Sequence, residues 1–110
     1  MTTYLMNTLP NILWQQGGGR IDQITANNAA AILRRKEGYV SVVGHQSTAT
    51  LYSQILDIPI QMNRVSVQVK PGDVIVAGLF TPTRRLAEGE IWTIEEMEAM
   101  PINWVGVLIG

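Results

Sequence analysis

The fold is decided by one stretch near the middle of the chain, YVSVVGHQSTATLYSQILDI, residues 39–58. Its first part, residues 39–43, is rich in β-branched and aromatic side chains, which is typical of a strand. The strand runs through residues 44–46 into Ser47, a residue type that caps helices. The expected helix carries its apolar side chains at Leu51, Ile55 and Ile58. A strand that leads directly into a helix predicts a fold of mixed α and β structure.

Two strands and two helices are expected before this stretch. Thr3–Met6 predicts a short opening strand, and residues 20–24 alternate well enough for a second one. Between them, residues 11–16 predict a brief helix that ends at a run of glycines. After the second strand, Thr25 can cap an alanine-rich helix over residues 26–36.

After the central stretch, alternation and turn residues predict a hairpin. Val65, Val67 and Val69 alternate with polar residues, as in a half-buried strand. Residues 71–73, Pro-Gly-Asp, predict a turn that leads into a more buried strand over Val74–Phe80. The two strands are therefore expected to pair in antiparallel fashion.

The last third of the chain combines a long loop with a helix and a strand. Residues 81–92 form a polar loop of a length that is often functional in a compact domain. Residues 93–96, Thr-Ile-Glu-Glu, fit the capping box and predict a short helix to about Met100. Residues 103–109 predict an apolar final strand. The expected fold class is α/β (α+β), a mixed β-sheet flanked by helices in a single domain, residues 1–110.

Composition excludes several classes of protein. The chain has 110 residues, 46% of them hydrophobic and 15% charged, which favours a homo-oligomer over a lone monomer. A formal net charge of -1 argues against a partner that is long DNA or RNA. With no cysteine there is neither a disulfide framework nor a thiolate nucleophile. The start of the chain lacks the pattern of a leader, and no stretch has the length of a membrane span, so a cytoplasmic location without a membrane partner is expected.

His45 is the only histidine and lies where the strand meets the helix. Helix N-termini attract anions because their first N–H groups lack partners and the helix dipole is positive there. Gly44 would let the backbone approach a phosphate, while Ser47 and Thr48 add hydroxyls. The junction therefore indicates a phosphate site. The competing interpretation is a well-capped helix with an incidental histidine.

A second group of polar residues lies far from His45 in sequence. Arg85 can neutralise a phosphodiester in its transition state, and Glu88 can orient or pair with a partner. Asn7, Asn63 and Arg64 stand at strand boundaries and are candidates for ligand binding, with turn capping as the alternative. Only the fold can bring these residues to His45.

The residue types favour one chemistry over the others. One histidine and no tight carboxylate cluster argue against a metal site, and we expect no cofactor. Ser47 is too close to His45 in sequence for a persuasive nucleophile and base. RNA cleavage requires less, because the ribose 2′-hydroxyl is an internal nucleophile that the enzyme mainly aligns. One histidine and one arginine can suffice.

Four motifs together resemble a known family. They are residues 4–7 (Tyr-Leu-Met-Asn), residues 44–48 (Gly-His-Gln-Ser-Thr), residues 63–65 (Asn-Arg-Val), and residues 85–89 (Arg-Leu-Ala-Glu-Gly) followed by the capping box. In their order and spacing the chain resembles the type III anti-CRISPR ring nucleases of archaeal viruses, phages and mobile elements. The resemblance implies degradation of cyclic tetra-adenylate, the second messenger of type III CRISPR systems, and hence suppression of that signalling.

The resemblance also implies roles for individual residues. His45 resembles the general acid that protonates the leaving 5′-oxygen as the 2′-hydroxyl attacks, which leaves a 2′,3′-cyclic phosphate. Arg85 and Glu88 resemble loop residues that position and stabilise the reacting phosphate. Ligand contacts are implied for Asn7, Gly44, Ser47, Thr48, Asn63 and Arg64. The implied assembly is a symmetric homodimer that binds the ring across its interface.

Two departures and two competing functions remain. Residues 17–19, all glycine, and Arg84, where relatives more often have an uncharged residue, could alter ring access or ring-size preference. A protein that only sequesters the messenger could use nearly the same pocket. A DNA-binding regulator conflicts with the slight acidity and the lack of a basic reading helix.

Overall fold

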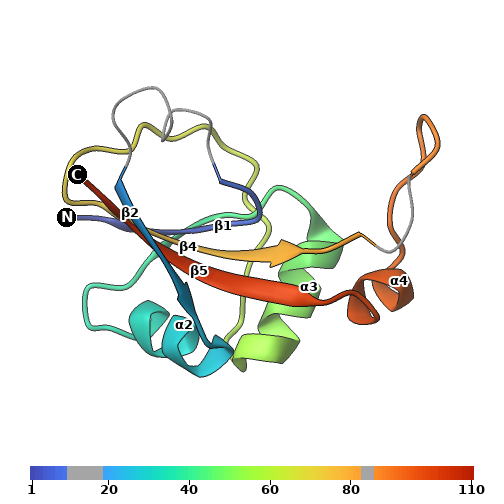
Figure 1. Cartoon of the computed structure of the whole chain (residues 1–110), viewed down its shortest axis with the longest axis horizontal. Coiled ribbons are helices and arrows are strands. Elements are labelled where there is room, and N and C mark those ends of the chain that lie inside the picture. The colour runs from blue at the N-terminus through green and yellow to red at the C-terminus, as the bar shows by residue number, and fades with distance from the viewer. Residues whose placement is uncertain (10–18, 83–85) are drawn as a thin grey trace.

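The computed structural model describes residues 1–9, 19–82 and 86–110 (Figure 1). In this part of the chain, five strands form one sheet and three helices accompany it. The strands are β1 (Thr3–Met6), β2 (Gly19–Ile24), β3 (Val40–Val42), β4 (Val74–Phe80) and β5 (Ile102–Ile109). The helices are α2 (Ala26–Leu33), α3 (Gln46–Leu56) and α4 (Ile94–Glu98). The brief helix expected over residues 11–16 lies outside the described residues.

The sheet is mixed, with the strand order β2-β5-β4-β1-β3. β1 lies between β3 and β4 and is parallel to both, whereas β5 is antiparallel to β4 and to β2. The carboxyl ends of the three parallel strands therefore meet at one edge of the sheet, where open α/β sheets usually bind their ligands. This confirms the expected fold class.

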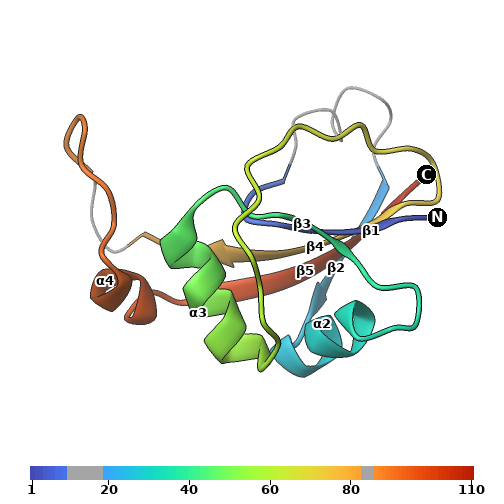
Figure 2. The same ribbon diagram turned by 180° about the vertical axis from the view of Figure 1, so that it is seen from behind.

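The two faces of the sheet are covered differently (Figures 1 and 2). The helices α2 and α3 pack on one face, over a core that includes Leu5, Val76 and Trp104. The opposite face buries Met6, Ile75, Val107 and Ile109, and it is partly covered by Val67 and Val69.

The predicted hairpin is wrong. Residues 65–69 form no strand, and β4 pairs with β1 and β5 instead. Val67 and Val69 do face the protein, but they pack onto the sheet surface from an extended segment that crosses it, while Val65 stays 46% exposed. The alternating pattern of residues 65–69 therefore predicts correctly that one side of this segment is buried. It does not distinguish a strand within the sheet from a segment that lies on the sheet.

Several helix boundaries also differ from expectation. The helix expected to carry Ile58 ends at Leu56, and the helix expected to reach about Met100 ends at Glu98. The helix expected over residues 26–36 ends at Leu33, with Arg34 as the C-cap. The Arg34 side chain reaches across to donate to the carbonyl oxygens of Leu56 and Asp57 at the end of α3. The N-cap of α3 is His45 and not Ser47, because His45 has extended backbone angles and its carbonyl accepts the first helical bond, from Ala49. Ser47 lies in the first turn.

Tyr52 of α3 fixes the edge of the sheet on which the ligand is expected. Its hydroxyl accepts from the Gly78 N–H and donates to carbonyl oxygens of Gly78 and Met6, just where β1 ends. Burial raises the pKa of this phenol, so it stays protonated. A side chain at Gly78 would come within 2.9 Å of the Trp104 ring, so glycine is required there. The ends of β1 and β4 are therefore held by α3.

Asp73 gives the fold a measurable dependence on pH. Burial opposes its charge, but hydrogen bonds from the backbone N–H groups of Thr2 and Lys70, together with the positive charges of the N-terminus and Lys70, outweigh burial and lower its pKa from the ordinary value. The charged Asp73 side chain thus stabilises the fold above pH 4, and this stabilisation is lost as pH falls through the folded-state pKa. We expect Asp73→Asn to lower the free energy of unfolding at neutral pH by about 1–3 kcal/mol, measured by urea unfolding.

The same variant should flatten the decline of stability below pH 4. The matched control is Asp22→Asn, because Asp22 is half exposed in an ion pair with Arg20 at 3.0 Å and such pairs contribute little. Equal losses in the two variants would show that the buried hydrogen bonds of Asp73 are not the source of the effect.

Among the helices of the described ranges, none is long and apolar enough to cross a membrane.

Candidate functional site

The junction between β3 and α3 forms the centre of the candidate site. His45 is exposed, and although it occupies the N-cap its side chain makes no capping hydrogen bond. The N–H groups of residues 46–48 precede the first helical hydrogen bond, which runs from Ala49 to His45. A histidine side chain and a set of helix-terminal donors are therefore presented together.

Asn7 links this junction to the end of β1. Its side-chain oxygen accepts a hydrogen bond from the Gly44 N–H at 3.2 Å. The bond holds Gly44, and with it His45, against the carboxyl end of the neighbouring parallel strand. Asn7 thus lies at the junction with His45, while its contact with a ligand stays a prediction.

Asn63 and Arg64 hold the other side of the junction. The Asn63 backbone N–H donates to the Val43 carbonyl at 2.8 Å, and its side chain donates to the Ser41 carbonyl at 2.8 Å. These bonds occupy the outer edge of β3, so Asn63 positions the strand. Arg64 is exposed, and its Nε donates to the Gly44 carbonyl at 3.2 Å. This contact places a cationic side chain beside Gly44, the residue that precedes His45 in the sequence.

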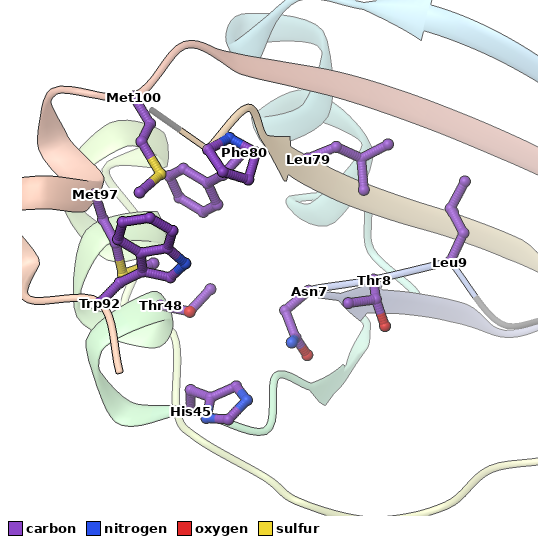
Figure 3. A pocket seen from close by; sticks show the side chains of 11 residues that line it. Asn7, Thr8, Leu9, His45, Thr48, Leu79, Phe80, Trp92, Met97 and Met100 are labelled. Atoms are coloured by element: carbon purple, nitrogen blue, oxygen red, sulfur yellow. The ribbon is translucent and has the colours of Figure 1, made fainter. Parts of the chain in front are cut away.

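A cavity of about 370 Å³ opens beside these residues (Figure 3). The Asn7 carboxamide, the His45 imidazole and the Thr48 hydroxyl border it on one side. Its other lining side chains are mostly apolar: Leu9, Leu79, Phe80, Pro82, Trp92, Met97 and Met100. The cavity therefore combines a small polar rim with an apolar wall, as small-molecule sites usually do.

A second cavity of about 310 Å³ also touches His45. It is lined by Ser47 and by three residues of the loop between β4 and α4, Leu86, Glu90 and Ile91. His45, Thr48, Trp92 and Met97 line both cavities.

Only part of the loop that carries the remaining candidate residues is described. Arg85 and Arg84 are outside the described residues. Glu88 is exposed in a turn closed by a hydrogen bond from Glu90 N to the Ala87 carbonyl, with Gly89 in the left-handed region. Glu88 is not among the residues that line the two cavities, whereas Glu90 lines the second. The Glu90 carboxylate also accepts a hydrogen bond from the Ala87 N–H.

Sequence reasoning missed the apolar wall. Trp92 and Met97 stand one residue before and four after the N-cap Thr93, which are the positions of a hydrophobic staple. The capping box of α4 was recognised and is confirmed, with both reciprocal hydrogen bonds present. The capping box also indicates the staple positions, and these predict that Trp92 packs against Met97.

A family model described as STIV B116-like matches residues 3–104 of the chain. Uncharacterized protein 26 of Sulfolobus islandicus filamentous virus (isolate Iceland/Hveragerdi) is 34% identical over 82 residues, which cover 74% of this chain and 67% of the relative. Uncharacterized protein ORF117 of Acidianus two-tailed virus is 31% identical over 100 residues, or 88% of this chain and 84% of the relative.

A solved structure extends the comparison to the fold. B116 of Sulfolobus turreted icosahedral virus matches with a TM-score of 0.73 and 21% identity, covering 98% of this chain and 99% of B116. At this identity the likeness concerns the fold alone. Since the family model spans most of the chain and both relatives are proteins of archaeal viruses, the chain belongs to the STIV B116-like family of small archaeal virus proteins.

Proposed function

We propose that the protein is a metal-independent ring nuclease that cleaves cyclic tetra-adenylate and so suppresses type III CRISPR signalling in the host cytoplasm. The observation that carries the proposal is the state of His45, which occupies a helix N-cap without capping the helix and lines two adjoining cavities. An N-cap residue is usually one whose side chain satisfies the helix, so this imidazole is available for another task.

The phosphate of the scissile linkage would lie at the N-terminus of α3. The unpaired N–H groups of residues 46–48 and the positive end of the helix dipole favour an anion there. Arg64 adds positive charge next to Gly44, and Thr48 offers a hydroxyl from the first turn. Arg85, on the loop that follows β4, is proposed to stabilise the transition state. Glu88 is proposed to help position the reacting phosphate when the loop contacts the ligand.

The reaction needs only groups that the chain and the substrate supply. The ribose 2′-oxygen forms a bond to phosphorus, and its proton passes to solvent. The bond from phosphorus to the 5′-oxygen breaks, and His45 protonates that oxygen as it leaves. The products are a 5′-hydroxyl end and a 2′,3′-cyclic phosphate end.

A symmetric homodimer suits this substrate. A ring of four identical nucleotides contains a twofold axis, so two protomers can present the same site to opposite linkages. We therefore propose a homodimer as the active form. A mass in solution equal to that of one chain, at concentrations at which the ring is cleaved, would contradict it.

The competing function is sequestration of the messenger without cleavage. The two are separated by incubating the protein with a large molar excess of cyclic tetra-adenylate and following intact ring over time. A nuclease consumes the excess in many turnovers, whereas a binding protein leaves all ring beyond its own sites intact. Depletion that stops at the number of binding sites would contradict the proposed activity.

A further inference from the structure

We propose, on the basis of the function above, that Tyr52 is a positioning residue of the reaction. Its hydroxyl keeps the carboxyl ends of β1 and β4 apart and, through Met6 and Asn7, holds the backbone that presents His45. The Tyr52 side chain is buried and lines neither cavity. Its effect on the reaction therefore passes through the residues that it holds, without contact with the substrate.

The first support is the place of the hydroxyl in the sheet. Met6 and Ala77 are the last residues that the ladder between β1 and β4 pairs. In a continued parallel ladder, the Gly78 N–H would donate directly to the Met6 carbonyl. The Tyr52 hydroxyl lies there instead, because it accepts from the Gly78 N–H at 3.0 Å and lies 3.3 Å from the Met6 carbonyl oxygen. One side-chain oxygen thus replaces the next bond of the ladder and ends the pairing of the two strands.

The gap that begins at this hydroxyl opens into the first cavity. Residues 7–9, which follow β1, line the cavity together with Leu79 and Phe80 at the end of β4 (Figure 3). If the two strands paired for one more residue, Asn7 would be drawn toward β4 and the cavity would narrow. The Tyr52 hydroxyl therefore sets the distance between two walls of the site.

The same hydroxyl is connected to His45 through the backbone. The Met6 carbonyl belongs to the peptide group that leads into Asn7. The Asn7 side chain accepts from the Gly44 N–H at 3.2 Å, and Gly44 directly precedes His45. A displacement at Met6 is therefore passed to the imidazole through one peptide group and one hydrogen bond.

The third support is the way the Tyr52 ring is held. It is fully buried, stacks on Phe80 with the ring centroids 6.2 Å apart, and packs against Trp104 with the centroids 4.9 Å apart. Its hydroxyl donates to the Gly78 carbonyl while it accepts from the Gly78 N–H. Burial raises the pKa of the phenol, so the proton needed for this double role is retained. Phenylalanine would keep the packing and remove only the bridge.

Tyr52→Phe is therefore the variant that tests the role. Cleavage of cyclic tetra-adenylate in single-turnover experiments should slow by about 10- to 100-fold, because a displacement of ~1 Å in an active site is enough for such a loss. Affinity for the intact ring, measured by equilibrium binding, should fall by a smaller factor. The reason is that the N–H groups at the start of α3 stay in place.

Amide hydrogen exchange tests the connection without any substrate. The Gly44 amide should exchange about 3- to 10-fold faster in Tyr52→Phe, the effect of weakening one hydrogen bond. The matched control is Tyr39→Phe, which also removes one bond to a backbone carbonyl, that of Pro59 at 3.3 Å. In the contacts described, the Tyr39 hydroxyl has no connection to Asn7 or Gly44. The control should leave turnover and Gly44 exchange unchanged.

A double variant separates positioning from a general loss of stability. If the hydroxyl acts through Asn7, adding Tyr52→Phe to Asn7→Ala should slow cleavage little beyond the larger of the two single losses. Independent damage would multiply the two losses. Thermal unfolding establishes whether Tyr52→Phe is folded at the assay temperature. If it is not, 4-aminophenylalanine in place of Tyr52 takes its role in the test, because an amine donates to the carbonyls but accepts poorly, and a smaller loss of the same kind is expected.

The possible failures are distinguishable. Wild-type turnover or wild-type Gly44 exchange in the chain altered at Tyr52 would overturn the positioning role alone, and so would multiplied losses in the double variant. A wild-type chain that leaves cyclic tetra-adenylate intact would overturn the proposed function, and the role of Tyr52 in the reaction with it, whatever the exchange of Gly44.

Discussion

Replacing His45 by alanine should lower the turnover of cyclic tetra-adenylate by about 10²- to 10⁴-fold, the contribution that a positioned general acid makes. Affinity for the ring should change little, because a proton donor to the leaving oxygen acts mainly in the transition state. Turnover is measured from single-turnover cleavage, and affinity from equilibrium binding of the intact ring. The fold should be unaffected, since the side chain is exposed and does not cap α3.

Gln46→Ala is the matched control for this variant. Gln46 is the next residue, is also exposed and lines neither cavity, and its side chain donates only to Thr50 of its own helix in the contacts described. Alanine keeps the backbone N–H that is proposed to face the phosphate, so only the side chain is tested. It should cleave at close to the wild-type rate. Equal losses of affinity and turnover in His45→Ala would instead identify His45 as a binding residue.

Removing the nucleophile should have a still larger effect. A ring in which every 2′-hydroxyl is replaced by hydrogen should bind but should not be cleaved at a detectable rate, because the attacking atom is absent. Binding is expected to persist because phosphate and base contacts remain. The measurement compares cleavage of the ribose and deoxyribose rings at saturating concentration.

A different mechanism makes the opposite prediction. An enzyme that activates water would attack phosphorus from outside the ring and would cut both substrates. Efficient cleavage of the deoxyribose ring would therefore contradict attack by the 2′-hydroxyl, even if His45 proves essential.

Local sequence signals predicted the elements well where the determinant lies within a few residues. The β-branched residues before Gly44, the capping Thr25 and the capping box at Thr93 each specify their own element, and each is present. The strand predicted from the alternating valines at residues 65–69 is absent, because these valines pack on a sheet surface formed by distant residues. Nothing in a period of two distinguishes those environments.

The candidate site was predicted in part for the same reason. His45 and Thr48 lie at or just after the end of β3 through local geometry, so their positions followed from the junction. Arg64 is brought there by the fold, through its hydrogen bond to the Gly44 carbonyl. Apart from Leu9, which follows β1, the apolar wall comes from the end of β4 and from the segment around α4. Its residues resemble core residues in sequence, and only the fold shows that Trp92 lines a cavity next to a histidine.

The loop marks the limit of reasoning from motifs. Glu88 is a candidate because its carboxylate can orient a partner and because it resembles a loop residue of the ring nucleases. In the described part of the loop, Glu88 lies in an exposed turn while Glu90 lines the second cavity. A turn that contains a left-handed glycine reverses the chain within a few residues. Sequence spacing therefore does not decide which of the two carboxylates faces the site.

Cleavage of cyclic tetra-adenylate by internal attack, with His45 as the acid, determines the chemistry of the product ends, so we propose to identify those ends. Purified protein is incubated with the ring in excess chelator, and the ends of the products are identified by mass spectrometry. We expect linear oligoadenylates with 5′-hydroxyl and 2′,3′-cyclic phosphate ends. An intact ring, or linear products with 5′-phosphate and 3′-hydroxyl ends, would contradict it.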